Sequence, residues 1–135
     1  MSIGVGGFAV LELQDEETML YSYGGFNLNI PKYRNLEKIR DGCILIARDA
    51  LPEPEIRRKR TRRPNGRKLV VEKRVYAEPS LQELIRTGKI SVSNCTNCWK
   101  QDKNGVDLTA IYLIASFFRS FQTGEKIPDK LVFYK

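Results

Sequence analysis

One short segment accounts for the net positive charge of this 135-residue chain. The stretch from Arg57 to Arg74 holds ten basic residues and one acid, a net charge of +9. The rest of the chain holds 13 basic and 15 acidic residues, a net charge of −2. Like charge at this density indicates a solvated or partner-binding surface, so the chain divides into a nearly neutral body and a strongly basic arm.

The arm has the sequence pattern of a β-hairpin that spans Glu55 to Tyr76. Its centre, Pro64-Asn65-Gly66, is a turn signature, because proline presets the first turn angle and Asn-Gly tolerates positive φ. With a three-residue loop, the opposed charged pairs are Arg63 with Arg67, Arg62 with Lys68, Arg57 with Lys73, and Arg58 with Glu72. Only the last pair is complementary, so the arm repels itself, and we expect it to order when an anion screens it.

A basic ribbon of two strands is suited to nucleic acid. Duplex DNA presents one negative charge per about 1.7 Å of axis, arginine forks grip phosphates and base edges, and a two-stranded ribbon fits a major groove. The sequence therefore predicts a non-catalytic DNA- or RNA-binding protein. The predicted contact residues are Arg57, Arg58, Lys59, Arg60, Arg62, Arg63, Arg67, Lys68, Lys73 and Arg74.

Three alternatives for the arm stay open at the level of sequence. The arm could dock on a nucleoprotein or an acidic protein, which would make the chain an interaction or inhibitor module. It could instead be a solvated hairpin, because charge runs are often solvated faces, or a localisation signal.

The body shows the short apolar and alternating runs of a small sheet. Strands are expected at residues 5–13, 18–23, 43–47, 89–93 and 131–134. An acidic turn joins the first two, and Gly24 with Gly25 is expected to end the second. The polar segment before the third strand is expected to hold one helical turn at residues 36–39.

Two helices complete the predicted body. Ser80 and Glu83 form a capping box, and Gly88 suits the end of that helix. Residues 106–122 predict a second helix that is apolar around nearly its whole circumference, with Asp107 at its start. The fold class is therefore α+β in one domain, residues 1–135: a small, mostly antiparallel sheet, a projecting basic hairpin, and two helices, the second central and apolar. That apolar helix would also fit a homodimer.

The cysteines do not complete a metal site in the sequence. Cys95 and Cys98 have the spacing of half a zinc site, and Cys43 and Asp102 would have to supply the other ligands. We expect ordinary reduced thiols and no metal or other cofactor.

Catalysis is the less favoured hypothesis, because the chain has no histidine, the commonest general base and metal ligand. The leading enzymatic alternative is a metal-dependent nuclease, for which Asp41 and Asp49 are the candidate carboxylates.

The aromatic residues near the first hairpin allow two interpretations. Tyr21, Tyr23, Phe26 and Tyr33 could stack on unpaired bases, but packing within the core is favoured for residues of this kind.

The expected location is the cytoplasm, without membrane attachment. No apolar run reaches the roughly 18 residues of a membrane helix. The first residues lack the basic region of a secretory signal, and an odd number of cysteines argues against a disulfide framework.

Overall fold

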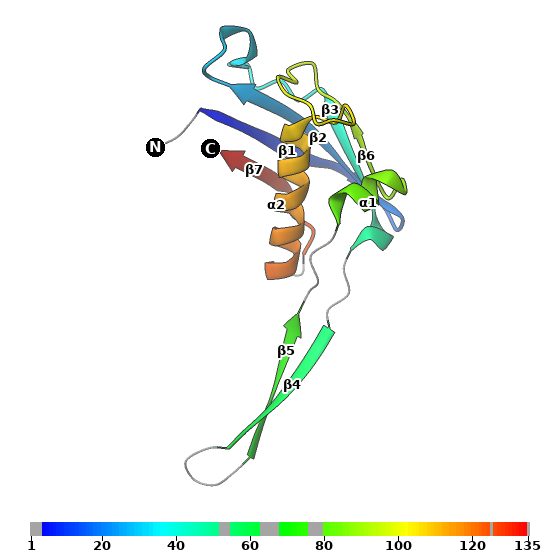
Figure 1. Cartoon of the computed structure of the whole chain (residues 1–135). Coiled ribbons are helices and arrows are strands. Elements are labelled where there is room, and N and C mark those ends of the chain that lie inside the picture. The colour runs from blue at the N-terminus through cyan, green and yellow to red at the C-terminus, as the bar shows by residue number, and fades with distance from the viewer. Residues whose placement is uncertain (1–3, 52–54, 63–67, 76–79, 125, 135) are drawn as a thin grey trace.

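The computed structural model describes residues 4–51, 80–124 and 126–134, together with the backbone of residues 55–62 and 68–75. These residues form a five-stranded sheet, two α-helices and a separate two-stranded sheet. The α+β class and the projecting hairpin are therefore as predicted (Figure 1).

The five-stranded sheet is antiparallel throughout and has the strand order β6-β3-β2-β1-β7. Its strands are β1 (Val5–Gln14), β2 (Thr18–Asn27), β3 (Gly42–Ala47), β6 (Ile90–Ser93) and β7 (Lys130–Tyr134). The turn between β1 and β2 is held by Asp15, whose carboxylate accepts hydrogen bonds from the amides of Glu17 and Thr18. All five strands were expected from the sequence, although β2 is longer than predicted.

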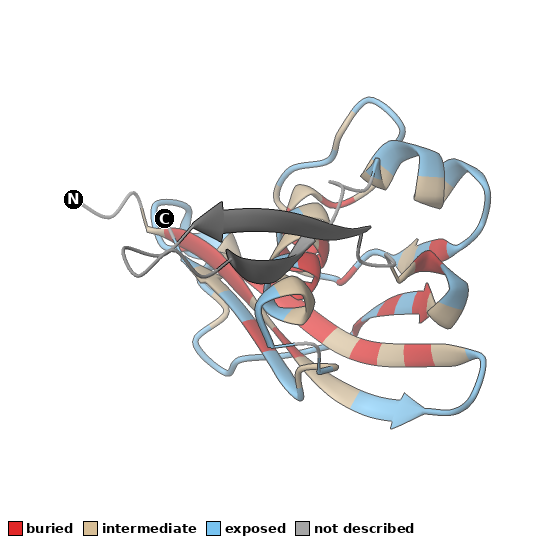
Figure 2. Ribbon diagram, turned by 90° about the horizontal axis from the view of Figure 1, so that it is seen from below, coloured by how far each residue is buried: buried red, intermediate tan, exposed pale blue. Residues whose placement is uncertain are grey.

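One face of this sheet is covered by the helix α2 (Leu108–Gly124) (Figure 1). The strands alternate between buried positions that face α2 and more accessible positions on the other side, as the stripes in Figure 2 show. The largest fully buried side chains are Tyr21, Tyr23, Phe117, Met19, Ile44, Ile46, Ile90, Leu113, Ile114 and Asp107. The expected apolar helix is thus the centre of the core, and one side of it, at Tyr112, Arg119 and Ser120, is exposed.

A pair of glycines lets α2 sit directly on the strands, and here the sequence prediction was wrong. Gly7 of β1 and Gly25 of β2 are register partners, and a Cβ atom at either would lie within 3.0 Å of a Thr109 side-chain atom. The β2 strand therefore continues through Gly24 and Gly25 to Asn27 instead of ending there. At this place glycine allows the helix to approach the strands closely and does not break the strand.

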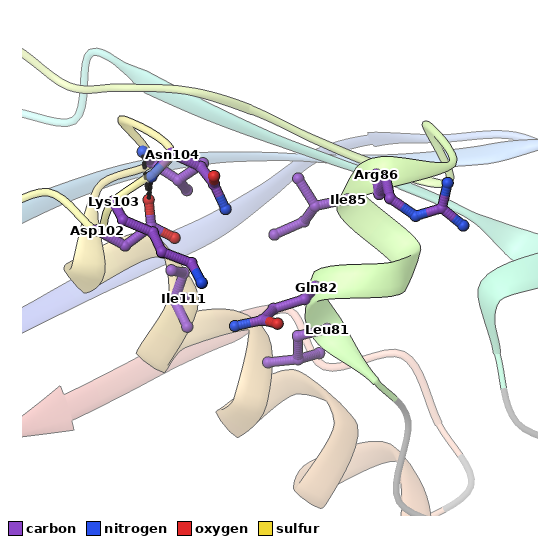
Figure 3. A pocket seen from close by; sticks show the side chains of 9 residues that line it. Leu81, Gln82, Ile85, Arg86, Asp102, Lys103, Asn104 and Ile111 are labelled. Atoms are coloured by element: carbon purple, nitrogen blue, oxygen red, sulfur yellow. Dashed lines mark hydrogen bonds between the residues drawn. The ribbon is translucent and has the colours of Figure 1, made fainter.

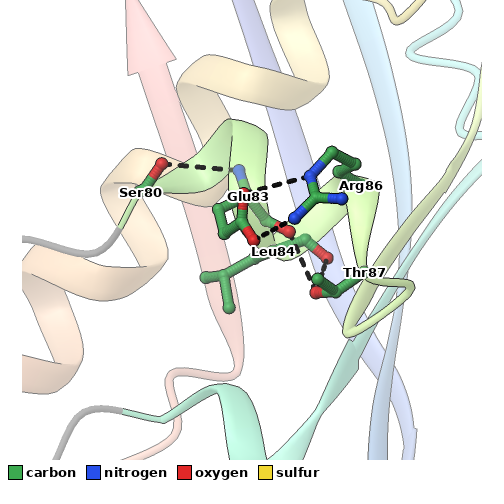
Figure 4. A network of polar contacts seen from close by, with 5 residues as sticks. All are labelled: Ser80, Glu83, Leu84, Arg86 and Thr87. Carbon is green, nitrogen blue, oxygen red and sulfur yellow. Dashed lines mark hydrogen bonds and ion pairs between the residues drawn. The ribbon is translucent and has the colours of Figure 1, made fainter.

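The short helix α1 (Leu81–Arg86) has the serine half of the predicted capping box. The Ser80 hydroxyl accepts a hydrogen bond from the amide of Glu83 at 3.4 Å, and Glu83 also pairs with Arg86 (Figure 4). After the helix, Gly88 has a φ of +81°, the left-handed conformation that glycine adopts most easily.

The segment between β2 and β3 differs from its prediction. Its helical turn is a 3-10 helix at Pro31–Tyr33, and residues 36–39 do not form one. The Asn35 side chain accepts a hydrogen bond from the amide of Ile39 and donates hydrogen bonds to the carbonyls of Gly25 and Ile39. These side-chain bonds to the backbone replace the helical pattern, as asparagine readily does in turns.

The arm is a second sheet of two strands, β4 (Glu55–Arg62) and β5 (Lys68–Val75). These strands pair with each other and lie apart from the five-stranded sheet (Figure 1). In the part of the chain that the structure describes, no helix is long and apolar enough to span a membrane.

Candidate nucleic-acid interface

The backbone of the arm has the predicted pairing register. Arg62 is opposite Lys68, and Arg57 is opposite Lys73, so two register pairs bring like charges together. Arg58 opposite Glu72 is the complementary pair. Arg63 and Arg67, with the turn between them, lie outside the described residues.

This register distributes the basic positions unequally between the two faces of the ribbon, because successive residues of a strand alternate between faces. One face holds the positions of Arg58, Arg60, Arg62, Lys68 and Arg74. The other face holds those of Arg57, Lys59 and Lys73. The arm therefore has a more basic and a less basic face.

The body presents a second candidate surface, the face of the sheet that α2 does not cover, which we call the open face. The strand register identifies which residues of β7, β1 and β2 lie on this face. Tyr134 and Phe26 both pair with Gly6, and their rings lie with centroids 5.9 Å apart. A Cβ atom at Gly6 would lie 2.6 Å from the Phe26 ring, so the glycine is what lets the ring lie across β1.

The next row of the open face continues the apolar surface. Val132 and Gly24 are the register partners of Phe8. The carbonyl of Ile39 lies over Gly24, where a Cβ atom would be only 2.0 Å from it. Val132 is 66% exposed and Tyr134 is 57% exposed, so much of this apolar and aromatic surface is open to solvent.

Basic residues border the open face. Arg40 reaches Glu12 across it at 4.0 Å, and Glu12 also accepts a hydrogen bond from Ser22. Lys130 is exposed on the same face, in the row of Val10. Because Arg40 and Lys130 outnumber Glu12, the local balance of charge favours an anion at this border.

The aromatic cluster expected from the sequence is split between the two sides of the sheet. Tyr21 and Tyr23 are fully buried against α2, as the packing interpretation predicted. Phe26 lies on the open face, with Phe8 and Tyr134 as its neighbours in the strand register. Sequence reasoning missed Phe8 and Tyr134, although alternation within their strands was the available signal.

A buried polar network lies on the α2 side, around Asp107, which is 0% exposed. Its carboxylate accepts hydrogen bonds from the Tyr23 hydroxyl at 2.8 Å, the Thr109 amide at 2.9 Å and the Cys95 thiol at 3.3 Å. The Tyr23 hydroxyl also accepts from the Cys95 amide. These contacts make Asp107 the cap of α2, and its oxygens are occupied by structural donors.

The cysteine pair belongs to this structural network. Burial, followed by the neighbouring Asp107 carboxylate, raises the pKa of the Cys95 thiol to about 12. Burial also raises the pKa of the Cys98 thiol. Both shifts disfavour the thiolate, which is the nucleophile and the metal ligand.

The additional zinc ligands considered in the sequence lie elsewhere. Cys43 is exposed on the open face, on the other side of the sheet from Cys95. The Asp102 carboxylate accepts hydrogen bonds from the amides of Asn104 and Val106 within its own loop. Within the described residues, no group of three or more His, Cys, Asp or Glu side chains is placed to hold a metal ion.

The carboxylates considered for a nuclease are not brought together. Asp41 and Asp49 flank opposite ends of β3, a strand of six residues, which separates them by roughly 20 Å. Asp41 accepts the side chain and the amide of Thr96, and the hydrogen bond from the Thr96 side chain lowers the pKa of this carboxyl. Neither residue is part of a cluster that could share a metal.

A pocket of about 510 Å³ lies between α1, α2 and the loop before α2 (Figure 3). Leu81, Ile85 and Ile111 supply its aliphatic lining, and Lys103 and Arg86 are at its border. Of the residues that the sequence indicated as functional, it contains only Asp102, the candidate zinc ligand.

Comparison of the chain with models of protein families, with curated proteins and with solved structures finds no match.

Proposed function

We propose that this protein binds nucleic acid without catalysing a reaction, and that the arginine-rich hairpin contacts the phosphates. The observation that carries the proposal is the charge partition, +9 between Arg57 and Arg74 against −2 elsewhere. The hairpin has few complementary pairs of its own, so an external polyanion is the partner that would neutralise it. The cytoplasm is the proposed location.

The pairing register supports a specific docking surface on the arm. The face with the positions of Arg58, Arg60 and Arg62 holds more basic residues than the opposite face. We expect this more basic face to supply most phosphate contacts. Phosphate contacts position a protein without reading bases, so the proposal includes no sequence specificity.

The test is the salt dependence of binding to duplex DNA, measured by fluorescence anisotropy. Each neutralised phosphate lowers the slope of log affinity against log salt by about 0.9, so about five contacts give a slope near −4 to −5. Replacing Arg58, Arg60 and Arg62 with alanine is expected to flatten the slope by about three units. Folding of the body should be retained, because β4 and β5 form a sheet separate from the five-stranded sheet.

A matched control removes the same charge from the other face of the ribbon. The variant Arg57→Ala, Lys59→Ala, Lys73→Ala also loses three positive charges, and we expect it to flatten the slope less. Equal effects would show that the arm acts as diffuse charge. If correctly folded protein binds neither DNA nor RNA at about 150 mM salt, the arm serves an acidic protein partner instead.

A further inference from the structure

We infer that the open face of the sheet binds the unpaired bases of a single strand, by stacking on Tyr134 and its neighbour Phe26. This inference rests on the proposed function and extends it, because it adds a base-binding surface to a phosphate-binding arm. It also predicts a preference that the arm alone does not give, for single-stranded over base-paired regions.

The first step is the geometry of the rings. Gly6 lies between Phe26 and Tyr134 in the strand register, and its missing side chain allows the two rings to approach to 5.9 Å. Tyr134 is 57% exposed, although a tyrosine on a sheet could have packed into the core as Tyr21 and Tyr23 do. Exposed rings on a sheet face are surfaces on which bases stack, whatever their sequence.

The second step is the surroundings of the rings. Phe8 and Val132 continue the apolar surface in the next row. An apolar face of this kind could also cover a second copy of the chain. The charge at the border favours nucleic acid, because the two cations on this face, Arg40 and Lys130, outnumber its acid, Glu12.

The third step is the segment between β2 and β3, whose Ile39 carbonyl lies over the open face at Gly24. It carries four basic residues, Lys32, Arg34, Lys38 and Arg40, and two acids, Glu37 and Asp41. The four basic residues outnumber the two acids, so the segment adds positive charge where it passes over the open face at Gly24. A strand whose bases lie on the rings would have its phosphates near this border.

The experiment compares single and double strands with one substitution. Tyr134→Ala is titrated against fluorescein-labelled oligo(dT) and oligo(U) of about 20 nucleotides, and against a duplex of equal length. We expect affinity for the single strands to fall about 5- to 150-fold, because stacking on one aromatic side chain has that effect. Duplex binding should be unchanged, and the salt slope should stay the same, because stacking releases no counterions.

Three further variants separate a ring effect from a general loss of structure. Tyr134→Phe keeps the ring and should bind within about threefold of the wild type. Val132→Ala removes an exposed side chain from the same strand and face, and Tyr112→Ala removes a 39% exposed ring from α2 on the other side. Tyr112→Ala should leave single-strand affinity nearly unchanged, and a loss as large as in Tyr134→Ala would overturn the inference. Val132→Ala trims the proposed surface without removing a ring, so it should weaken single-strand binding less than Tyr134→Ala does.

The outcomes distinguish this inference from the proposed function. If the arm variant loses binding and Tyr134→Ala does not, the arm binds nucleic acid and the open face does not. If Tyr134→Ala weakens single-strand and duplex binding equally, base stacking is excluded. If it instead converts a dimer to a monomer in analytical ultracentrifugation, a second copy is the occupant of this face.

Discussion

Asp107 joins three elements of the fold through one carboxylate. It caps α2, accepts the Tyr23 hydroxyl from β2 and accepts the Cys95 thiol from the loop after β6. Each donor has a partner, so burial of this acid is compensated by hydrogen bonds. The cysteine spacing that resembled half a zinc site in the sequence is explained, at Cys95, by this contact.

The network makes a prediction about alkaline pH. An unfolded Cys95 thiol loses its proton near its ordinary pKa of 9.0, whereas the folded protein raises that pKa to about 12. The unfolded state therefore holds fewer protons between these values, so the stability from this thiol is complete below pH 9 and is lost as the pH rises toward 12. Burial also raises the pKa of Tyr21 and of Tyr23, which adds to the decline.

Urea unfolding from pH 7 to pH 11 measures this effect. The free energy of unfolding should decline above pH 9, and Cys95→Ala should make the decline shallower. Cys43→Ala removes an exposed thiol and serves as the control, because it should leave the decline as it is in the wild type. A decline that is the same in all three proteins would remove Cys95 from the explanation.

At the scale of elements, the contact between α2 and the sheet depends on glycine. The three nearest atoms to a Cβ at Gly25 all belong to Thr109, at 2.9, 3.0 and 3.2 Å. A side chain at Gly25 would push the first turn of α2 away from β2. The position of the helix, and with it the cap at Asp107, follows from this contact.

A double-mutant cycle tests that contact. Gly25→Ala should destabilise the protein by about 1–3 kcal/mol, because it overpacks a well-packed site. In a Thr109→Ala background, which removes two of the three close atoms, the same change should cost much less, a coupling of about 0.5–3 kcal/mol. Gly124→Ala is the control, because a Cβ atom there would meet nothing within 4 Å. If the destabilisation by Gly25→Ala and by Thr109→Ala simply adds in the double mutant, the proposed packing is contradicted.

At the scale of the whole molecule, the strands of the arm do not pair with the strands of the body. The strands β4 and β5 form their own sheet, and the five other strands pair among themselves. The core cluster is built from residues of the five-stranded sheet, α2 and the segments beside them. The described part of the body thus has a core cluster of its own.

Removing the arm should therefore leave the body folded. In the test variant, a short Gly/Ser linker replaces residues 52–79. The melting temperature of this variant should stay within about 4–8 °C of the wild type, which corresponds to a change of roughly 1 kcal/mol in the free energy of unfolding. The same protein should lose its affinity for duplex DNA. Loss of cooperative unfolding in this variant would show that the arm contributes to the core.

Much of the fold could be predicted because its signals are local. The N-cap at Ser80, the helix that begins after Asp107 and the pairing of β4 with β5 each depend on residues close together in the chain. The same holds for the charge of the arm. These features follow from backbone preferences and short-range hydrogen bonds, which a sequence displays directly.

Other features were decided by contacts between distant segments. Gly24 and Gly25 read as a break in the sequence, but Ile39 and Thr109 pack against them, so the strand continues. Alternation placed Phe26 and Tyr134 on one side of their strands, yet only the position of α2 determined that this side is the open one. The physical reason is that strand alternation is symmetric between two faces, and the face that becomes the core is chosen by where the helix packs.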